Sequence, residues 1–176
     1  HTLTQFIDRQ PDSVFTASEK RQLKDRLRRT ELQLPPPASV YADEPDLFTK
    51  NDVFYERTVS GKMRMRVGGA YVLSARSWFN LIFTLAHEFA HAIDPCELRQ
   101  AHIAIPAYDR LTACFLDNGL IASRTTRLEC GRNDQLSETF ADWIAVRIAS
   151  EALGHFATEF QRPDLINAAT NSVRDL

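Results

Sequence analysis

Two histidines four residues apart, His87 and His91, enclose Glu88 in the pattern H-E-x-x-H. In an α-helix, side chains four residues apart lie on the same face, so the two imidazoles can bind a single Zn²⁺. The carboxylate of Glu88 follows the first histidine directly, where it is placed to act on a zinc-bound water rather than on the metal. The pattern therefore predicts a zinc site that activates water.

The residues around this motif predict the helix that it needs. Apolar side chains recur at spacings of three and four, which indicates a helix with one buried face. These side chains are Trp78, Leu81, Ile82, Leu85 and Phe89. Ser74 and Ser77 are candidate N-caps, and the helix should stop at Asp94, because a residue before proline avoids helical geometry. The alternative is an ordinary helix that carries two histidines by coincidence.

A zinc site of this kind needs a third ligand from the protein. A second apolar stripe downstream predicts a helix that begins near Asp134 or Ser137. The stripe consists of Phe140, Ile144 and Ile148. Glu138 and Asp142 share one face of this helix, where Glu138 can bind the metal and Asp142 can hydrogen-bond the outer ring nitrogen of a ligand histidine. An ordinary exposed acidic face is the alternative for both residues.

H-E-x-x-H followed by E-x-x-x-D on a later helix resembles the gluzincin metallopeptidases, and most closely their neprilysin-like branch. The resemblance implies that His87, His91 and Glu138 bind one zinc ion. It also implies that Glu88 activates water and that Asp142 orients a histidine ligand. The expected fold is α+β and zincin-like, with a small sheet that has an exposed edge strand and packs on two zinc-binding helices.

Residues 53–59 and 62–67, separated by Ser60-Gly61, predict a β-hairpin, and in the second strand Met63, Met65 and Val67 alternate with basic residues. In gluzincins an edge strand beside the cleft pairs with the substrate backbone. Residues Gly69, Ala70 and Tyr71 resemble a degraded form of that strand's motif, which would suit an extended peptide. A plain edge strand made irregular by glycines is the alternative.

Asp94 and Glu97 offer a different third ligand. They stand where the metzincin peptidases carry a glycine and their last metal ligand. Asp94 before Pro95 does not supply the sharp turn for which that family uses glycine. Glu97 is therefore the weaker alternative to Glu138, and Asp94 either supports the site from beyond the helix or caps the following turn.

The expected reaction is hydrolysis of a peptide or protein substrate. Zn²⁺ bound by two neutral imidazoles and one carboxylate keeps a positive charge, polarises a carbonyl and lowers the pKa of water towards about 7. Glu88 would then act as the general base and return the proton to the leaving amine. The family adds a donor to the oxyanion. Candidates for this donor are His155, Tyr71, Tyr108 and His102.

Two other functions are compatible with the same residues. One is a catalytically silent zinc- or peptide-binding module on a zincin scaffold. A structural site would have no need of the base Glu88, which speaks against this module. The other is a metal-free helical domain in which the motif arose by chance.

Length and composition bound the remaining possibilities. The chain has 176 residues, of which 44% are hydrophobic and 25% charged, as is usual for a single globular domain. A formal net charge of −2 does not favour nucleic acid or an anionic membrane surface as partner. We find no apolar run long enough to span a bilayer.

The single expected domain, residues 1–176, divides into four segments: a helical preface (1–34), a proline-rich connector (35–50), a sheet and zinc-site core (51–148) and a C-terminal helical segment (149–176). In the preface, Thr16 to Glu19 form a possible capping box, and Leu23 and Leu27 share an apolar face. The basic side chains of this helix are expected on its solvated side. They are Lys20, Arg21, Lys24, Arg26, Arg28 and Arg29.

The stretch between the two zinc helices contains Cys96, Cys114 and Cys130. In an oxidising compartment one pair of these cysteines can close the loop with a disulfide. The chain begins at His1 rather than at methionine, which together with the cysteines favours a periplasmic or secreted protein. Residues 103–116 predict a short helix in the same stretch.

Overall fold

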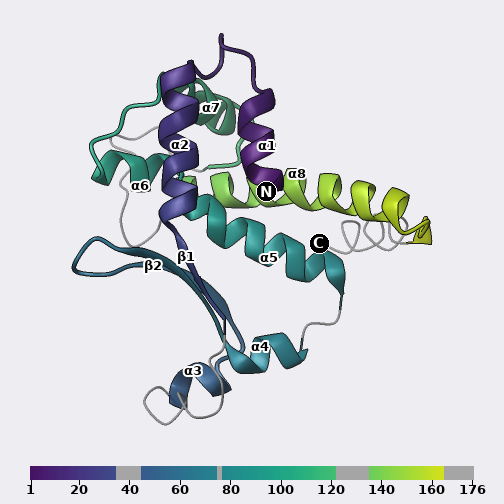
Figure 1. Ribbon diagram of the computed structural model, residues 1–176. Helices are drawn as coiled ribbons and strands as arrows, with labels where there is room; N and C mark the ends of the chain where they lie inside the picture. The colour runs from purple at the N-terminus through teal and green to yellow at the C-terminus, as the bar shows by residue number, and fades with distance from the viewer. Residues whose placement is uncertain (35–44, 75–76, 122–134, 165–176) are drawn as a thin grey trace.

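The computed structural model describes residues 1–34, 45–74, 77–121 and 135–164. This part of the chain is α+β, with helices packed around and beside a small three-stranded mixed sheet (Figure 1). None of the helices in these ranges is long and apolar enough to cross a membrane. The predictions for Asp134, Cys130 and most of the proline-rich connector fall outside the described residues.

The N-terminal segment forms helices α1 (Thr2–Arg9) and α2 (Ala17–Arg29). The predicted capping box is confirmed, because the Thr16 hydroxyl accepts from Glu19 N and the Glu19 carboxylate accepts from Thr16 N. Leu23 and Leu27 are buried as expected. The preface is not purely helical, since it ends in strand β1 (Glu31–Gln33).

The predicted hairpin is confirmed as strands β2 (Val53–Arg57) and β3 (Met63–Val67). Gly61 has a φ of +80°, which side chains other than glycine rarely adopt. The strand order is β1-β3-β2, with β1 parallel and β2 antiparallel to the central strand. β2 is therefore an edge strand. Its free edge faces the helix that carries the H-E-x-x-H motif, since Tyr55 N donates to Glu88 of that helix.

The edge strand predicted at Gly69–Tyr71 is wrong, because these residues begin helix α4 (Gly69–Ser74). The chain leaves the sheet at Gly68, whose N–H donates to Asp52 O at 2.9 Å. A Cβ atom at Gly68 would lie 2.0 Å from Lys50 O, so only glycine fits this close backbone contact. The short helix α3 (Pro45–Thr49) lies next to α4 and falls within the predicted connector.

Helix α5 (Trp78–His91) carries the H-E-x-x-H motif. Ser77 is its N-cap and accepts from Asn80 N at 3.1 Å, as predicted. The buried face is displaced from the predicted stripe: Phe79, Ala86 and Ala90 are buried, whereas Trp78 is 65% exposed. Small alanines on the buried face allow close approach of the next long helix.

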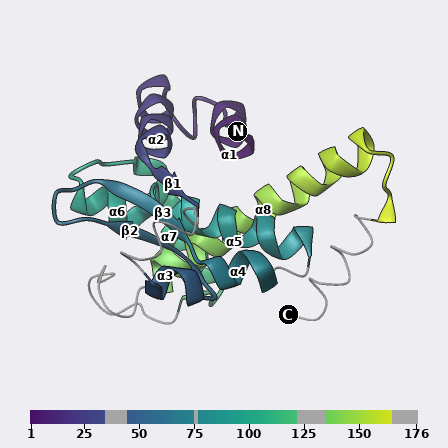
Figure 2. The same cartoon turned by 60° about the horizontal axis from the view of Figure 1, so that its bottom comes forward.

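That helix is α8 (Gln135–Glu159), which lies alongside α5 in both views (Figures 1 and 2). Phe140, Ile144 and Ile148 are buried as predicted. Ser137 is also buried, but it lies within the helix rather than capping it. The packing of α5 on α8 places the H-E-x-x-H motif opposite the first turns of α8.

Between α5 and α8, the described residues form helices α6 (Pro95–Gln100) and α7 (Pro106–Asp117). Asp94 caps α6, since its Oδ1 accepts from Glu97 N at 2.7 Å. Helix α7 confirms the short helix predicted within residues 103–116. The apolar sides of α1, α2, α5, α6, α7 and α8 share one hydrophobic core, so the two motif helices are held by packing from several directions.

Candidate metal centre

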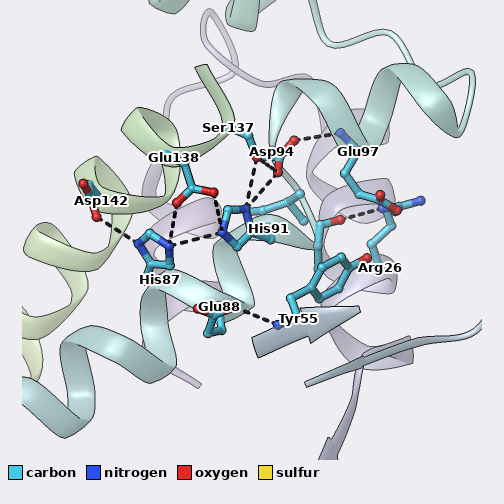
Figure 3. A network of polar contacts seen from close by, with 12 residues as sticks. Arg26, Tyr55, His87, Glu88, His91, Asp94, Glu97, Ser137, Glu138 and Asp142 are labelled. Carbon is cyan, nitrogen blue, oxygen red and sulfur yellow. Dashed lines mark hydrogen bonds and ion pairs between the residues drawn. The ribbon is translucent and has the colours of Figure 1, made fainter. Parts of the chain in front are cut away.

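The two motif histidines converge through their Nε2 atoms near the C-terminus of α5. These atoms are 3.2 Å apart, and the ring centroids are separated by 4.8 Å (Figure 3). The side chains of His87 and His91 are 16% and 13% exposed. Most of each ring is therefore covered by protein, and the Nε2 atom of each imidazole faces the Nε2 atom of the other.

Glu138 completes the group from helix α8. Its two carboxylate oxygens lie 3.2 Å from His87 Nε2 and 3.7 Å from His91 Nε2. Ligand atoms bound tetrahedrally to zinc at about 2.0–2.2 Å are roughly 3.3–3.5 Å apart. His91 Nε2 and Glu138 Oε2 each lie 3.2 Å from His87 Nε2, whereas the 3.7 Å contact with His91 Nε2 involves the other oxygen, Oε1. These contacts, and the chemistry of two imidazoles and one carboxylate, are compatible with Zn²⁺.

The outer nitrogen of His87 faces Asp142, one turn after Glu138 on α8. His87 Nδ1 and Asp142 Oδ1 are 2.9 Å apart. When Nδ1 carries the proton it donates to this carboxylate, and the lone pair is left on Nε2, the atom that faces Glu138. The geometry is the one predicted for Asp142 from its spacing.

The outer nitrogen of His91 faces two groups, Asp94 and Ser137. His91 Nδ1 lies 3.1 Å from Asp94 Oδ2 and 3.1 Å from Ser137 Oγ. The Ser137 hydroxyl in turn donates to Asp94 Oδ2 at 2.5 Å. Burial acts to lower the pKa of His91, but the hydrogen bond and charge of Asp94, helped by Glu88 and Glu138, hold that pKa above its usual value.

Ser137 is the site residue that the sequence did not reveal. Its position before Glu138 suggested only a helix start, and no spacing rule connects it with Asp94 or His91. The contact exists because α8 packs on α5 and brings the first turn of α8 over the α5–α6 turn. The alternative roles considered for Asp94 are both realised, since it caps α6 and contacts His91.

Glu88 faces away from Glu138, towards the edge strand β2. Its Oε2 accepts from Tyr55 N at 2.7 Å. Burial raises the pKa of Glu88 above its ordinary value, although the Tyr55 N–H and both imidazoles act in the opposite direction. One ligand atom from each of His87, Glu88 and His91 also lies within 4.8 Å of the others. We nevertheless take Glu138 as the third ligand, because its oxygens lie 3.2 and 3.7 Å from the two Nε2 atoms, whereas Glu88 Oε2 accepts from Tyr55 N.

An open hollow of about 410 Å³ lies at this group. It is bounded by the start of β2, by the motif residues of α5 and by Ser137 and Glu138 of α8. A larger hollow of about 670 Å³ lies between α6 and α7, but it includes none of the three predicted ligands. We therefore take the smaller hollow as the site, because the convergent metal-ligating groups line it.

The predicted oxyanion donors are not at this hollow. Tyr108 is buried and donates its hydroxyl to Ile93 O at 2.9 Å. The Tyr71 hydroxyl lies 3.5 Å from Asn80 O at the other end of α5. His155 lies towards the C-terminal end of α8, where its exposed ring pairs with Glu159, and His102 lines the hollow between α6 and α7.

Glu97, the weaker candidate for the third ligand, is already paired. Its Oε1 accepts from Arg26 Nη2 at 2.5 Å and also contacts the guanidinium of Arg57. Arg26 is buried, which corrects the prediction that it lies on the solvated side of α2. Glu97 lines the hollow, but its charge is balanced by arginines rather than directed at the histidines.

The cysteines partly agree with their prediction. Cys96, in the first turn of α6, is disulfide-bonded, as expected if one pair of cysteines closes the stretch between the motif helices. Cys114 is free and exposed on α7. Cys96 also lines the hollow at the histidines.

No protein-family model matches the chain, and neither a curated protein nor a solved structure matches it. The function of the chain is therefore argued from the arrangement of His87, His91, Glu138 and their partners.

Proposed function

We propose that the chain is a zinc-dependent metallopeptidase of the gluzincin type, in which His87, His91 and Glu138 hold the metal. One observation carries the proposal: the two Nε2 atoms and the Glu138 carboxylate converge at separations of 3.2, 3.2 and 3.7 Å. The hydrogen-bonded outer nitrogens support it, because carboxylates behind both imidazoles are typical of zinc sites.

Zn²⁺, when bound, supplies a Lewis acid that polarises a carbonyl and makes water acidic enough to attack it near neutral pH. Glu88 would accept the proton of the attacking water and return it to the leaving amine. The position of Glu88 supports this role. Its Oε2 accepts from Tyr55 N, so this oxygen is directed towards β2 rather than towards Glu138. Burial favours the protonated form of Glu88, which suits a group that must hold a proton and then release it.

In this proposal β2, rather than residues 69–71, borders the substrate. Tyr55 N points out of the sheet towards Glu88, and by the alternation of an antiparallel ladder Val53 and Arg57 also direct their backbone groups outward. Val53 N and Tyr55 N already donate to Asp52 Oδ1 and Glu88 Oε2. An extended peptide that passes the hollow, which Val53 and Tyr55 line, would therefore pair with the remaining outward groups of this edge. The substrate would then be an extended segment of a peptide or an unfolded protein.

A second candidate function is a zinc-binding module without catalysis on the same scaffold. It is favoured by one observation: within the described residues, Tyr71, Tyr108, His102 and His155 all lie away from the hollow. An acyl-transfer site without an oxyanion donor would lose a large share of its rate. Glu88 argues for catalysis, since a purely structural zinc site has no use for a partly buried carboxylate beside its ligands.

Hydrolysis of an unfolded protein separates the two functions. Zinc-loaded protein should cleave reduced, unfolded casein, and the activity should disappear with 1,10-phenanthroline and in Glu88→Gln. Glu159→Gln, an exposed glutamate on α8, serves as the matched control and should keep full activity. Zinc binding without any cleavage would favour the silent module.

A further inference from the structure

Arg26 is the one residue of the basic face of α2 whose burial is at odds with its charge. It is 8% exposed, whereas Arg21, Arg28 and Arg29 on the same helix are exposed. Burying a guanidinium is costly unless the charge is paired and hydrogen-bonded. The contacts of Arg26 therefore indicate what the buried charge does.

The guanidinium of Arg26 joins the two ends of one short turn. Its Nε donates to Ala92 O at 2.7 Å, at the C-cap of α5. Its Nη2 donates to Glu97 Oε1 at 2.5 Å, in the first turn of α6. Both partners lie far along the chain from α2, and the turn between them contains Asp94 (Figure 3).

Asp94 is the residue of this turn that reaches the candidate metal centre. Its Oδ1 accepts from Glu97 N at 2.7 Å, and its Oδ2 lies 3.1 Å from His91 Nδ1. The same Oδ2 accepts from Ser137 Oγ at 2.5 Å. A shift of the turn relative to α5 would therefore move the carboxylate that faces the imidazole of His91.

Glu97 connects the same turn to the sheet. The carboxylate that binds Arg26 also contacts the guanidinium of Arg57 at the end of β2. Tyr55, two residues earlier on β2, directs its ring towards this pair (Figure 3). Burial and the charge of Glu97 raise the pKa of the Tyr55 hydroxyl, so this hydroxyl stays neutral beside the ion pair.

We propose that Arg26 is a positioning residue of the zinc site, which bridges Ala92 O and Glu97 so that the α5–α6 turn holds Asp94 against His91. The proposal rests on the zinc site argued above. It assigns to the N-terminal helix α2 a part in metal binding, although α2 contributes no ligand. The rival view is that Arg26 only anchors α2 to the core.

Zinc affinity measured beside stability separates these views. We would compare the wild type with Arg26→Met and Arg26→Lys, using competition with a chromogenic zinc chelator. Urea unfolding of the zinc-free proteins supplies the stability of each variant. Arg28→Met is the matched control, because Arg28 is an exposed arginine two residues away on the same helix.

The positioning role predicts a zinc affinity about 10-fold weaker in Arg26→Met, at the lower end of the effect of losing a direct partner of a ligand histidine. The zinc affinity of Arg26→Lys should lie between those of this variant and the wild type. An ammonium group keeps the positive charge but lacks the several guanidinium N–H donors that reach both partners. Arg28→Met should bind zinc within about twofold of the wild type. With Co²⁺ in place of zinc, the visible absorption of Arg26→Met should also differ from that of the wild type.

A double variant, Arg26→Met with Glu97→Met, guards against a failure to fold. Replacing both partners of a buried ion pair with apolar side chains is often tolerated. We expect this variant to regain stability relative to Arg26→Met and to keep the weakened zinc affinity. If the anchoring view is correct, zinc affinity should return together with stability.

A folded Arg26→Met or double variant that binds zinc as tightly as the wild type would overturn the positioning role and leave the proposed function intact. A wild-type protein that binds no zinc would overturn both, since there would then be no ligand to position. A weaker zinc affinity in Arg28→Met equal to that in Arg26→Met would also contradict the proposal. It would show a general effect of charge on α2 rather than a contact at the turn.

Discussion

The backbone N–H of Tyr55 donates to the carboxylate of Glu88 at 2.7 Å, and so joins the edge strand to the candidate general base. Glu88 lies between the two histidines in sequence, yet its carboxylate is turned towards β2 while Glu138 faces both imidazoles. In the proposed function, the two carboxylates have different roles: Glu88 would transfer the proton and Glu138 would bind the metal.

Glu88→Gln should abolish hydrolysis and leave zinc affinity nearly unchanged. The amide keeps an oxygen that can accept from Tyr55 N, so the local structure should persist, but it cannot take a proton from water. We expect a loss of about 10²-fold or more in kcat, the usual contribution of a general base. Turnover close to that of the wild type would exclude Glu88 as the base.

Glu138→Ala should weaken zinc binding more severely than any change outside the three ligands. Since the side chain is half-exposed, its removal should cost little stability in the zinc-free protein. We expect a loss of more than about 100-fold in zinc affinity, measured by chelator competition. The control is Glu151→Ala on the same helix, and full zinc retention in Glu138→Ala would require a different third ligand.

Asp142→Ala should weaken zinc binding by roughly 10 to 100-fold, because His87 loses the acceptor of its Nδ1 proton. Asp142→Asn keeps an acceptor oxygen without the charge and should bind zinc with an affinity between those of the alanine variant and the wild type. The same competition assay measures both. Equal affinities for all three proteins would show that Asp142 is an exposed acidic residue without a role in the site.

Ser137→Ala should weaken zinc binding and also lower stability. It removes the hydroxyl that donates to Asp94, a buried carboxylate that would then lack one of its partners. We expect a loss of about 1–3 kcal/mol in the free energy of unfolding of the zinc-free protein. Thr139→Ala on the same helix is the control, since Thr139 is partly exposed and its hydroxyl donates to Leu120 O instead.

Much of the frame of the site could be predicted from local patterns. The helix of the H-E-x-x-H motif, its Ser77 cap and the hairpin before it follow from periodicity, capping and turn residues. These features depend on residues within a few positions of one another. The approach of Glu138 and Asp142 to His87 joins distant segments, and their four-residue spacing predicts it only together with the H-E-x-x-H motif and the gluzincin resemblance.

The predictions that failed depend on contacts between distant segments. Gly68 and Gly69 suggested an irregular strand, but the close contact of Gly68 with Lys50 O ends β3 and lets a helix begin. Arg26 is predicted on the solvated face of α2 because the local sequence gives no sign of its partner Glu97, which lies 71 residues away. Ser137 lies near the start of its helix as predicted, but nothing in the local sequence indicates Asp94 as its partner. Local propensity cannot report such tertiary contacts.

Metal content measured by plasma mass spectrometry, on protein purified without chelators and then exposed to zinc, tests the central claim most directly. The arrangement of His87, His91 and Glu138 predicts about one zinc per chain, with the metal lost in a variant that carries both His87→Ala and His91→Ala. A wild-type protein that contains no zinc even after zinc is offered would contradict the metal centre and the proposed peptidase function with it.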